Sequence, residues 1–592
     1  MTPDESDRLA ALFLKSAQAT PDRVAVRDSG GAWTYDEVAA AASDLAERLT
    51  AAGVAPGDRV GVMAARRAGG PVAILAVLWS GAAYVPITPG WPAARRAAVL
   101  EGAQARLVLA VDAEQDTPEG VPRMDLTTPE LLQARSAAPS SPRPRPHPGA
   151  AYVIFTSGST GAPKGVEVRS AGAAGLVASV VSLTGMGPDS VFVALSDFAF
   201  DISVFEIFAP WSVGGELVIA AELQILANQL GPLLEAPGRR PFLQTTPTVL
   251  ERLLQAGLEL PSDTVLLLAG ERLRRSLVAQ VAHVEQVWNL YGPTEATIYA
   301  TAHACLPPAP DDAEPDLPIG TPVNGAVAEI RPLSDGSSDG SSGSSSGSSE
   351  EVGELLIGGP GVALGYCGRP DLTAERFLDG GARYATGDVV RRRADGLLVH
   401  AGRLDRQVKI RGNRVELDEV EGALADLAGH GRVAVRMDVH GVVGPHLAAF
   451  VADPHCDVLE LRRRLADRLP AYMVPTRIYQ VPEIPTTSSG KTDHSSLRAP
   501  EESGAWDDAV FATLSKLWER HLGTPAAPDG NFYALGGHES TASQIATGLA
   551  AAHDIEVDIT VILRNPALSD LAAAVTELVR TQVMVRTPTT HD

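Results

Sequence analysis

The chain has 592 residues, of which 45% are hydrophobic and 20% are charged, and its formal net charge is −23 at pH 7. This length predicts about three domains, and the composition is that of a globular protein. The negative charge argues against a nucleic-acid partner or an anionic membrane surface, so any bound nucleotide must be held by local cations and N–H groups.

The N-terminus and the cysteines predict a cytoplasmic protein. The first residues, MTPDESDRLAALF, are acidic and lack the basic start and apolar stretch of a signal peptide. Cys305, Cys367 and Cys456 lie far apart, which favours three buried thiols in a reducing compartment. Gly69 to Ile87 is uncharged, but Gly, Pro and Ser interrupt it. We expect a buried helix followed by a strand here, and no membrane partner.

From about residue 20 to 400, helical and strand patterns alternate. A helix is expected at Tyr35 to Leu49, and strands at Arg59 to Met63, Val191 to Leu195 and Val265 to Leu268. This alternation predicts an α/β fold with mostly parallel strands. Ser334 to Ser349 is a low-complexity Gly/Ser segment, and regular patterning resumes at GELLIGG, so we expect a surface loop there and no domain boundary.

The last third of the chain changes in character. Near Asp405 the basic, β-rich sequence RQVKIRGNRVEL leads into a predicted small α+β unit, with helices at Asp418 to Leu427 and Leu459 to Leu469 and a strand at Leu447 to Val451. A helical module follows from Trp506 to about residue 580, and the tail TQVMVRTPTTHD is expected to fray. The predicted divisions are residues 1–404, 405–500, 505–582 and 583–592.

A loop rich in Gly, Ser and Thr lies within Tyr152 to Val168, YVIFTSGSTGAPKGVEV. Its glycines allow close approach of a ligand, its hydroxyls and N–H groups donate hydrogen bonds, and Lys164 adds a positive charge. These features predict an anion cradle for a polyphosphate. It is not a Walker loop, because Pro163 precedes the lysine and Gly165 follows it. The alternative is an ordinary hairpin turn.

The loop resembles the phosphate loop of adenylate-forming enzymes, especially the amino-acid-activating domains of nonribosomal peptide synthetases. The resemblance implies a catalytic role for Lys164 and an ATP-binding role for the loop residues Thr156, Ser157, Gly158, Ser159, Thr160 and Gly161.

Asn289 to Glu295, NLYGPTE, resembles the adenine and magnesium motif of the same family. By that resemblance Tyr291 stacks on the base, Thr294 approaches the α-phosphate, and Glu295 helps to hold Mg²⁺, a cation that prefers oxygen ligands. Taken alone, the segment could be a β-turn with a satisfied glutamate.

Three further motifs extend the resemblance. YATGD implies that Asp388 grips the ribose, and GRLDRQ implies that Arg403 contacts ribose or phosphate and that Asp405 is a domain hinge. PTTSSGKTD, which follows LPAYMVP, implies that Lys491 bridges the substrate carboxylate and the α-phosphate. The family usually has Asn where Ser489 stands. Each charge could otherwise be a solvated surface group.

The resemblance implies a reaction that needs no protein nucleophile. A bound carboxylate attacks the α-phosphate, magnesium and lysines neutralise charge, and pyrophosphate leaves. In the family, the small domain then rotates so that a carrier thiol can attack the acyl-adenylate.

The apolar stretch FAFDISVFEIF contains Asp201 and Glu206 and no basic residue. A buried carboxylate requires a partner, and by resemblance Asp201 grips the substrate α-ammonium; otherwise it is an exposed acid at a helix start. The pocket positions carried over by motif are Asp201, Ile202, Phe205, Gln244, Leu267, Ala269, Leu290, Ile298 and Tyr299.

These pocket positions favour a small substrate. They contain no second charge, which disfavours acidic and basic side chains. Phe205, Leu267 and Tyr299 occupy volume, and the set resembles glycine-activating pockets most. Ala269, Phe205 and Tyr299 depart from that pattern, so alanine, another small apolar amino acid and a phenylglycine-type substrate stay open.

Asn531 to Leu549, NFYALGGHESTASQIATGL, resembles a peptidyl carrier domain that bears 4′-phosphopantetheine on a serine, with Leu563 to Ala572 as its closing helix. With Gln544 and Ile545 in register, Glu539 takes the serine position and Ser540 follows, rotated by about 100 degrees. Either Ser540 is the attachment site, or the carrier is unprimed and serves as a docking domain.

The whole chain therefore resembles an adenylation domain followed by a four-helix carrier domain. The implied cofactors are ATP, Mg²⁺ and 4′-phosphopantetheine. The implied partners are a small amino acid, a phosphopantetheinyl transferase, and downstream synthetase or tailoring enzymes, with an MbtH-like activator left open. The rival interpretations are an acyl-CoA synthetase-like ligase and a non-catalytic scaffold.

Overall fold

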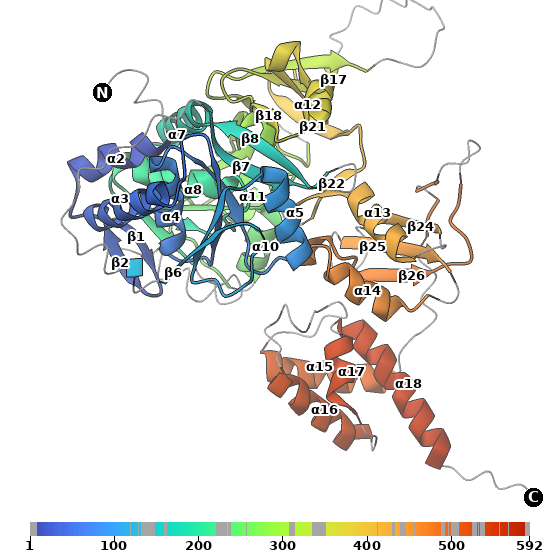
Figure 1. Ribbon diagram of the computed structural model, residues 1–592. Helices are drawn as coiled ribbons and strands as arrows, with labels where there is room; N and C mark the ends of the chain where they lie inside the picture. The colour runs from blue at the N-terminus through green and yellow to red at the C-terminus, as the bar shows by residue number, and fades with distance from the viewer. Residues whose placement is uncertain are drawn as a thin grey trace, which may run out of the picture. The chain divides into compact units, whose positions relative to one another are not determined.

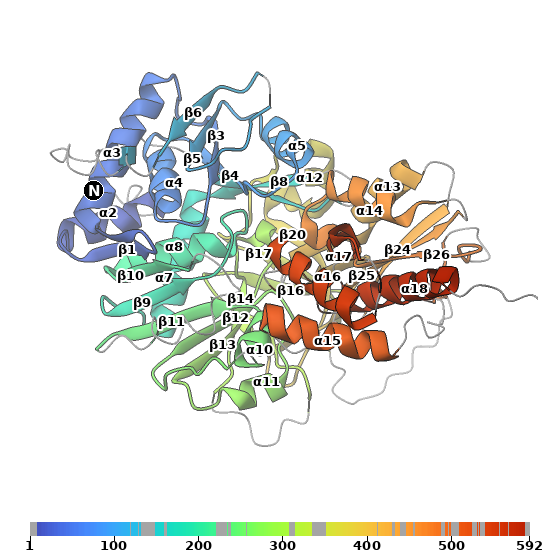
Figure 2. The same ribbon diagram turned by 90° about the horizontal axis from the view of Figure 1, so that it is seen from below.

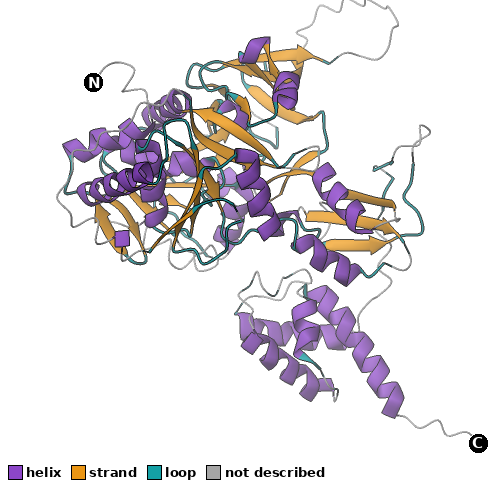
Figure 3. Ribbon diagram, viewed as in Figure 1, coloured by secondary structure: helices purple, strands orange, loops and turns teal. Residues whose placement is uncertain are grey.

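The computed structural model describes residues 9–586 except 119, 128–129, 132–148, 159–162, 221–233, 235–237, 256, 307–313, 334–350, 411–412, 429–431, 439–445, 454–455, 487–491, 495, 499–507, 524–529, 531, 533–534, 536–538, 554, 556 and 566. The chain divides into two compact units, residues 1–419 with 467–471, and residues 420–466 with 472–592. Figures 1 and 2 label the elements, and Figure 3 colours them by type.

A nine-stranded sheet forms one layer of the first unit, in the order β15-β14-β13-β12-β11-β9-β10-β1-β2. All neighbours from β13 to β1 are parallel, and only the pairs at the two ends are antiparallel. The strands are β1 (Val24–Asp28), β2 (Gly31–Thr34), β9 (Ser190–Ala194), β10 (Glu216–Ile219), β11 (Arg240–Thr245), β12 (Val265–Ala269), β13 (Gln286–Tyr291), β14 (Thr301–Ala304) and β15 (Thr321–Pro322).

A seven-stranded sheet forms a second layer, in the order β18-β8-β7-β4-β3-β5-β6. It is parallel from β7 to β6, and the hairpin β7–β8 adds an antiparallel edge. The strands are β3 (Arg59–Ala64), β4 (Ala83–Ile87), β5 (Leu107–Val111), β6 (Arg123–Leu126), β7 (Ala150–Thr156), β8 (Lys164–Arg169) and β18 (Gly365–Tyr366).

One large apolar cluster joins the two sheets through α2 (Leu9–Ala19), α3 (Tyr35–Ala51), α4 (Gly69–Trp79), α7 (Ser170–Thr184) and α8 (Ile202–Val213). Figures 1 and 2 both show α2, α3 and α4 side by side. Helix α4 is buried on every side, as its uncharged sequence predicts. The opposite faces pack on α10 (Pro247–Gln255) and α11 (Arg275–Gln280), and on α5 (Ala93–Ala103).

A five-stranded sheet and a hairpin complete the first unit. The sheet runs β16-β17-β20-β19, with β21 on β20, and the hairpin is β22–β23. The low-complexity segment lies outside the described residues, and the strands on either side of it, β16 and β17, pair with each other. The elements are β16 (Val327–Pro332), β17 (Glu351–Gly358), β19 (Phe377–Leu378), β20 (Arg383–Arg392), β21 (Leu398–Arg403), β22 (Gln407–Ile410), β23 (Asn413–Glu416), α12 (Pro370–Arg376), η2 (Thr294–Ala296) and η3 (Asp379–Gly381).

The second unit contains a three-stranded sheet and a group of helices. The sheet is β24-β25-β26, and the helices α15 to α18 share their own apolar cluster around Trp518 and Phe532. Helix α13 runs across the division between the units. The elements are α13 (Leu417–Ala428), β24 (Arg432–Asp438), β25 (His446–Ala452), α14 (Val458–Ala466), η4 (Ala471–Met473), β26 (Arg477–Gln480), α15 (Asp508–Leu522), α16 (Glu539–His553), α17 (Ile559–Arg564) and α18 (Leu568–Arg586).

The predicted α/β fold with mostly parallel strands is confirmed, and so are the helix at Tyr35 and the buried helix and strand within Gly69 to Ile87. In the part of the chain that the structure describes, every helix is too short or too polar to cross a bilayer.

Four expectations need correction. The helix that begins at Val458 ends at Ala466 and not at Leu469, because the residue before Pro470 disfavours helical backbone. The expected closing helix is broken between α17 and α18, where the sequence has Pro566. Helix α18 continues through the first part of the tail that was expected to fray. Cys456 is only partly buried, whereas Cys305 and Cys367 are buried as predicted.

Candidate active site

The phosphate-loop motif lies between two paired strands. Strand β7 ends at Thr156 and β8 begins at Lys164, and these two residues are directly paired. The Ser157 hydroxyl donates to the Arg414 carbonyl at 3.0 Å and accepts from the Glu416 N–H at 3.2 Å. The Gly158 N–H donates to Glu419 Oε2 at 2.9 Å. Ser159, Thr160 and Gly161 lie outside the described residues. Ser157 and Gly158 are therefore bound by the hairpin β22–β23 and the start of α13.

Lys164 faces acidic and aromatic partners from distant segments. Its Nζ lies 3.8 Å from Glu295 Oε1 and 3.9 Å from Glu416 Oε1, and 5.0 Å from the centre of the Tyr366 ring. Burial and the nearby Arg414 guanidinium lower the pKa of Lys164 to about 8, against the opposing charges of the two glutamates. The lysine can therefore meet an anion as a desolvated cation near neutral pH.

Glu295 is fully buried in the 3₁₀ turn η2. Its carboxylate accepts from Arg414 Nη1 at 2.7 Å and from the Tyr366 hydroxyl at 2.8 Å. Burial alone raises its pKa, but the charges of Arg414 and Lys164 outweigh that effect and hold the pKa at about 2. Glu295 is thus ionised at neutral pH, and the guanidinium of Arg414 neutralises its negative charge.

The chemistry of Glu295 fits the magnesium role that the sequence implies, because hard cations prefer carboxylate oxygens. The described residues contain no group of three or more His, Cys, Asp or Glu that could hold a metal ion by itself. A magnesium ion at Glu295 would therefore take most of its ligands from a nucleotide and from water.

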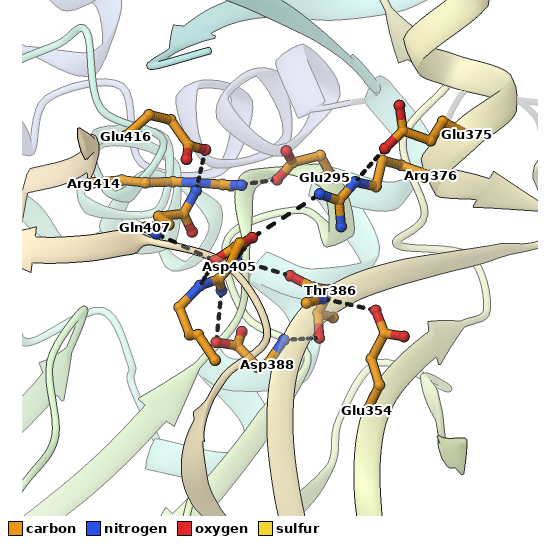
Figure 4. A network of polar contacts seen from close by, with 12 residues as sticks. Glu295, Glu354, Glu375, Arg376, Thr386, Asp388, Asp405, Gln407, Arg414 and Glu416 are labelled. Atoms are coloured by element: carbon orange, nitrogen blue, oxygen red, sulfur yellow. Dashed lines mark hydrogen bonds and ion pairs between the residues drawn. The ribbon is translucent and has the colours of Figure 1, made fainter. Parts of the chain in front are cut away.

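Asp388, the predicted ribose ligand, lies at the centre of a polar network (Figure 4). Its Oδ2 accepts from the Tyr291 hydroxyl at 2.6 Å, and its Oδ1 accepts from Arg403 Nη1 at 2.6 Å and lies 3.1 Å from His400 Nε2. Burial raises the pKa of Asp388, yet His400 and Arg403 together hold it below its usual range. The sequence did not predict His400 as a partner.

Asp405, the predicted hinge, ties the turn between β21 and β22 to its surroundings. It pairs with Arg403 Nε at 2.7 Å and lies 4.0 Å from Arg376 Nη2, as Figure 4 shows for Arg376. Arg403 thus bridges the ribose ligand and the hinge residue. The role of Asp405 as a hinge stays a prediction.

Asp201, the predicted amine ligand, immediately precedes α8 and is partly exposed. Removal from water raises its pKa, the Thr294 side chain acts against this rise, and the charge of Glu295 adds to it. Thr294 and Glu295 are the two predicted nucleotide-site residues on η2. Thr294 and Glu295 therefore both influence the charge of Asp201, and the removal of its carboxylate from water makes ionised Asp201 favour a nearby cation.

Four of the predicted pocket residues, Gln244, Leu267, Ala269 and Leu290, share one face of the nine-stranded sheet. Gln244 on β11 pairs with Leu267 on β12, and Ala269 on β12 pairs with Leu290 on β13. This face packs on α8, because Leu267, Ala269 and Leu290 belong to the same apolar cluster as Phe205. The structure thus brings the predicted pocket set together.

The segment that ends at Tyr299 has a strained backbone. Thr297 and Ile298 have φ angles of 60° and 63°, a region that β-branched residues rarely adopt. The Thr297 hydroxyl donates to the Gly361 carbonyl at 2.5 Å, and the Phe205 and Tyr299 rings meet edge to face with centroids 5.7 Å apart. Such strain persists only where the surroundings fix it, and it is common at binding sites.

Glu206, on α8, was unassigned by the sequence and proves to anchor the segment before Asp201. It accepts from the Leu195 N–H at 3.2 Å and from the Ser196 N–H and hydroxyl at 3.1 and 3.0 Å. Burial raises its pKa to about 7, and the nearby Arg66 acts against this rise. No sequence pattern could predict these contacts, because two of the three donors are backbone groups.

A close contact from α4 supports the same segment. A methyl group at Gly70 would collide with the ring of Phe198, which lies three residues before Asp201. The glycine therefore lets this ring pack directly against the helix backbone.

Besides Ser159, Thr160 and Gly161, three further predicted site residues are without structural description. Lys491 lies outside the described residues. Glu539 and Ser540 both lie in the first turn of α16, but their side chains are outside the described part. The structure thus leaves the choice between them open.

Three family models match consecutive parts of the chain. They are "AMP-binding enzyme" over residues 13–367, "AMP-binding enzyme C-terminal domain" over 419–491, and "Phosphopantetheine attachment site" over 512–575. The first model alone covers more than half of the chain.

Similar proteins agree with these matches. The AMB antimetabolite synthetase AmbB of Pseudomonas aeruginosa is 36% identical over 588 residues, which cover 96% of this chain and 45% of the relative. The crystal structure of holo-AB3403, a four-domain nonribosomal peptide synthetase bound to AMP and glycine, has a TM-score of 0.58 and 28% identity and covers 100% of this chain and 43% of its own.

A third similar protein matches over its whole length. The structure of holo-PA1221, which contains adenylation and PCP domains, has a TM-score of 0.72 and 24% identity and covers 98% of both chains, so it supports the fold. The chain spans about half or less of the length of most of the curated relatives it matches.

Proposed function

Because this chain belongs to the AMP-binding enzyme family and joins an adenylation domain to a carrier domain, we propose that it activates a small amino acid with ATP. The products are an aminoacyl adenylate and pyrophosphate, and the thiol of 4′-phosphopantetheine on the carrier domain then takes the aminoacyl group and releases AMP. We assign this activity to nonribosomal peptide or related natural-product synthesis. The observation that carries the proposal is that Lys164, from the predicted phosphate loop, lies 3.8 Å from Glu295, the predicted magnesium ligand.

Each residue has a defined role in this proposal. Asp201 holds the substrate ammonium, which leaves the substrate carboxylate directed toward the nucleotide. A carboxylate oxygen attacks the α-phosphorus, and the bond between that phosphorus and the pyrophosphate oxygen breaks. Lys164 and Lys491 stabilise the added negative charge. Magnesium beside Glu295 supplies further charge neutralisation on the phosphate oxygens.

The nucleotide itself is held by two groups of residues. Asp388 and Arg403 bind the ribose, Tyr291 contacts the adenine, and the loop from Thr156 to Gly161 binds phosphate. In this structure Arg414 pairs with Glu295, and Glu419 accepts a hydrogen bond from the Gly158 N–H. ATP binding therefore exchanges these internal contacts for contacts with phosphate and magnesium.

Our preferred substrate is glycine, with alanine or a phenylglycine-type amino acid as alternatives. The bulky pocket residues Phe205, Leu267 and Tyr299 and the lack of a charge besides Asp201 support this choice, and the similar holo-AB3403 is described as bound to AMP and glycine. Ser540 is our preferred attachment site for 4′-phosphopantetheine. A phosphopantetheinyl transferase would then attach this group to the carrier domain. With Glu539 at the attachment position instead, the carrier would serve as a docking domain. Downstream enzymes would take the loaded aminoacyl group, and an MbtH-like protein is a candidate activator.

The test is ATP–pyrophosphate exchange with the proteinogenic amino acids and phenylglycines. We expect exchange with a small amino acid and a great loss of exchange in Lys491→Ala. Exchange with no amino acid would exclude the proposal and favour a non-catalytic scaffold. Thioester formation with free coenzyme A that exceeds loading of the carrier would favour the acyl-CoA synthetase-like alternative. Intact-mass spectrometry of wild type and Ser540→Ala after priming tests the attachment site.

A further inference from the structure

One short segment, residues 363–367, binds the two motifs to which the proposed function assigns phosphate and magnesium. Two of its N–H groups donate to β8, the strand that begins with Lys164, at the carbonyls of Glu167 and Gly165 at 2.8 and 2.7 Å. A third N–H donates to the Glu295 carbonyl at 2.9 Å. The backbone of this segment therefore ties the lysine strand to the turn that carries the glutamate.

Tyr366 is the residue of this segment whose side chain contacts both predicted catalytic groups. Its hydroxyl donates to Glu295 Oε1 at 2.8 Å, and Lys164 Nζ lies 5.0 Å from the centre of its ring. Tyr366 is 5% exposed, and the Phe377 ring meets its ring edge to face with centroids 5.4 Å apart. Its own N–H donates to Thr373 Oγ1 at 2.9 Å. The ring that the lysine and the glutamate share is thus fixed by packing and by its backbone.

The two oxygens of the Glu295 carboxylate have different partners. Oε1 accepts from the Tyr366 hydroxyl and lies 3.8 Å from Lys164 Nζ, whereas Oε2 accepts from Arg414 Nη1 at 2.7 Å (Figure 4). In the proposed function, ATP binding replaces the contact with Arg414. Oε2 is then the oxygen that becomes free, because the tyrosine still holds Oε1.

We propose that Tyr366 is a positioning residue, which holds Glu295 Oε1 and Lys164 so that Glu295 meets a magnesium ion with Oε2 while the lysine faces phosphate. Tyr366 acts through these two side chains, and no sequence motif assigned it a role. The inference rests on the proposed function and adds to it the residue that orients its predicted metal ligand.

A purely structural hydroxyl would behave differently. A buried carboxylate needs hydrogen-bond donors, so removal of the hydroxyl lowers stability in either case. Partners that bind a metal ligand from behind also set its orientation, and their loss weakens metal binding. The magnesium dependence of ATP binding therefore separates the two roles, because a loss of stability alone leaves it unchanged.

The test is titration calorimetry of ATP on the full chain without amino acid, once with magnesium and once with EDTA. The ratio of the two dissociation constants gives the magnesium effect. In Tyr366→Phe this ratio should fall by about tenfold, the low end of the loss that follows removal of such a partner. Metal-free ATP should bind within about twofold of wild type, because the ring beside Lys164 remains. Tyr366→Leu also removes the ring, so metal-free ATP should bind about threefold more weakly or worse.

A matched control is available in another tyrosine of the same unit. Tyr35 on α3 is fully buried, and its hydroxyl donates to the Gly215 carbonyl at 2.7 Å. Tyr35→Phe therefore also loses one buried hydrogen bond, but it is not a predicted site residue. Its thermal midpoint should fall, whereas its magnesium effect should stay within about twofold of wild type.

Glu295→Gln provides a second variant that does not depend on the folding of Tyr366→Phe. The Tyr366 hydroxyl and the Lys164 ammonium are both donors, so they should hold the amide oxygen at the Oε1 position. The amide NH₂ group then takes the Oε2 position, where it cannot bind a cation. Magnesium should therefore change ATP affinity by less than about twofold in this variant.

Several results would overturn the inference. A magnesium effect in folded Tyr366→Phe that equals the wild-type effect excludes the positioning role, and so does an equal fall in Tyr35→Phe. Retention of the wild-type magnesium effect in Glu295→Gln excludes it as well. Amino-acid-dependent ATP–pyrophosphate exchange would leave the proposed function standing in each case. Absence of ATP binding to the wild type removes the proposed function together with this inference.

Discussion

Replacement of Arg414 by methionine should destabilise the nucleotide-free protein by leaving Glu295 buried with less compensating charge. The guanidinium lies 2.7 Å from the Glu295 carboxylate, which is fully buried. Lys164 at 3.8 Å and the Tyr366 hydroxyl at 2.8 Å remain in the variant. Breaking a buried ion pair from one side is destabilising because the other charge stays desolvated.

The size of the effect follows from the pKa of Glu295. A value of about 2 in place of the usual 4.5 corresponds to roughly 3 kcal/mol. Arg414 contributes most to this shift, but Lys164 and Tyr366 contribute as well. Replacing Arg414 also removes the cost of burying its guanidinium. We therefore expect the free energy of unfolding to fall by about 2 kcal/mol. In a unit of this size the thermal midpoint should fall by about 2–4 °C.

The pH dependence has a definite sign. Folding lowers the pKa of Glu295, so its stabilising contribution is present above pH 4.5 and is lost as the pH falls from 4.5 toward 2. The midpoints of wild type and Arg414→Met should therefore differ at pH 7 and converge in this acid range. Magnesium and ATP should narrow the gap at pH 7, because the ion supplies a cation beside Glu295.

The control is Arg406→Met, which removes a pair between Arg406 and Asp418 at the same hairpin. Asp418 is 47% exposed, so this variant should lose less than about 1 kcal/mol. Differential scanning fluorimetry with and without magnesium and ATP measures both variants. Equal midpoints for the two variants at pH 7, or a gap that does not shrink in acid, would refute the reasoning.

Three further predictions concern ligands. Lys164 has a pKa of about 8 in the free protein, so KM for ATP should rise as the pH passes from 7 to 9, and Lys164→Met should flatten that rise; an unchanged profile contradicts the assignment. Asp201→Asn should raise KM for the amino acid by about 10–100-fold, the effect of a lost charged hydrogen bond, and leave KM for ATP within about twofold. Asp388→Asn should weaken ATP binding in titration calorimetry by about tenfold but 2′-deoxyATP binding by less, and equal losses would argue against a ribose contact.

The sequence predicted those features that depend on local pattern or on short motifs. The alternation of helical patterns with apolar runs was enough to predict layers of parallel strands. The buried helix that begins at Gly69 could be predicted because its sequence contains no charged residue. The resemblance of two motifs predicted that Lys164 and Glu295 serve the same ligand, and they lie 3.8 Å apart.

Other features depend on contacts that no local pattern contains. Arg414 reaches Glu295 across more than one hundred residues, and its own motif indicated only a basic strand region. Tyr299 was interpreted by its volume and Gln244 only as a pocket position carried over by motif, because the burial of their polar atoms becomes visible only in the structure. Glu206 is held mainly by backbone N–H groups, which every residue type provides.

The contact between Gly70 and Phe198 limits how the specificity of this protein can be redesigned. Gly70 belongs to a helix that packs between the two large sheets and is not one of the predicted pocket positions, yet it permits the position of the Phe198 ring shortly before Asp201. Replacing the pocket residues of this chain by those of a relative would change the residues that line the pocket but not the contact between Gly70 and Phe198. Directed evolution of altered substrate choice should therefore include positions on α4, because small shifts of that helix move the anchoring acid without changing any lining residue.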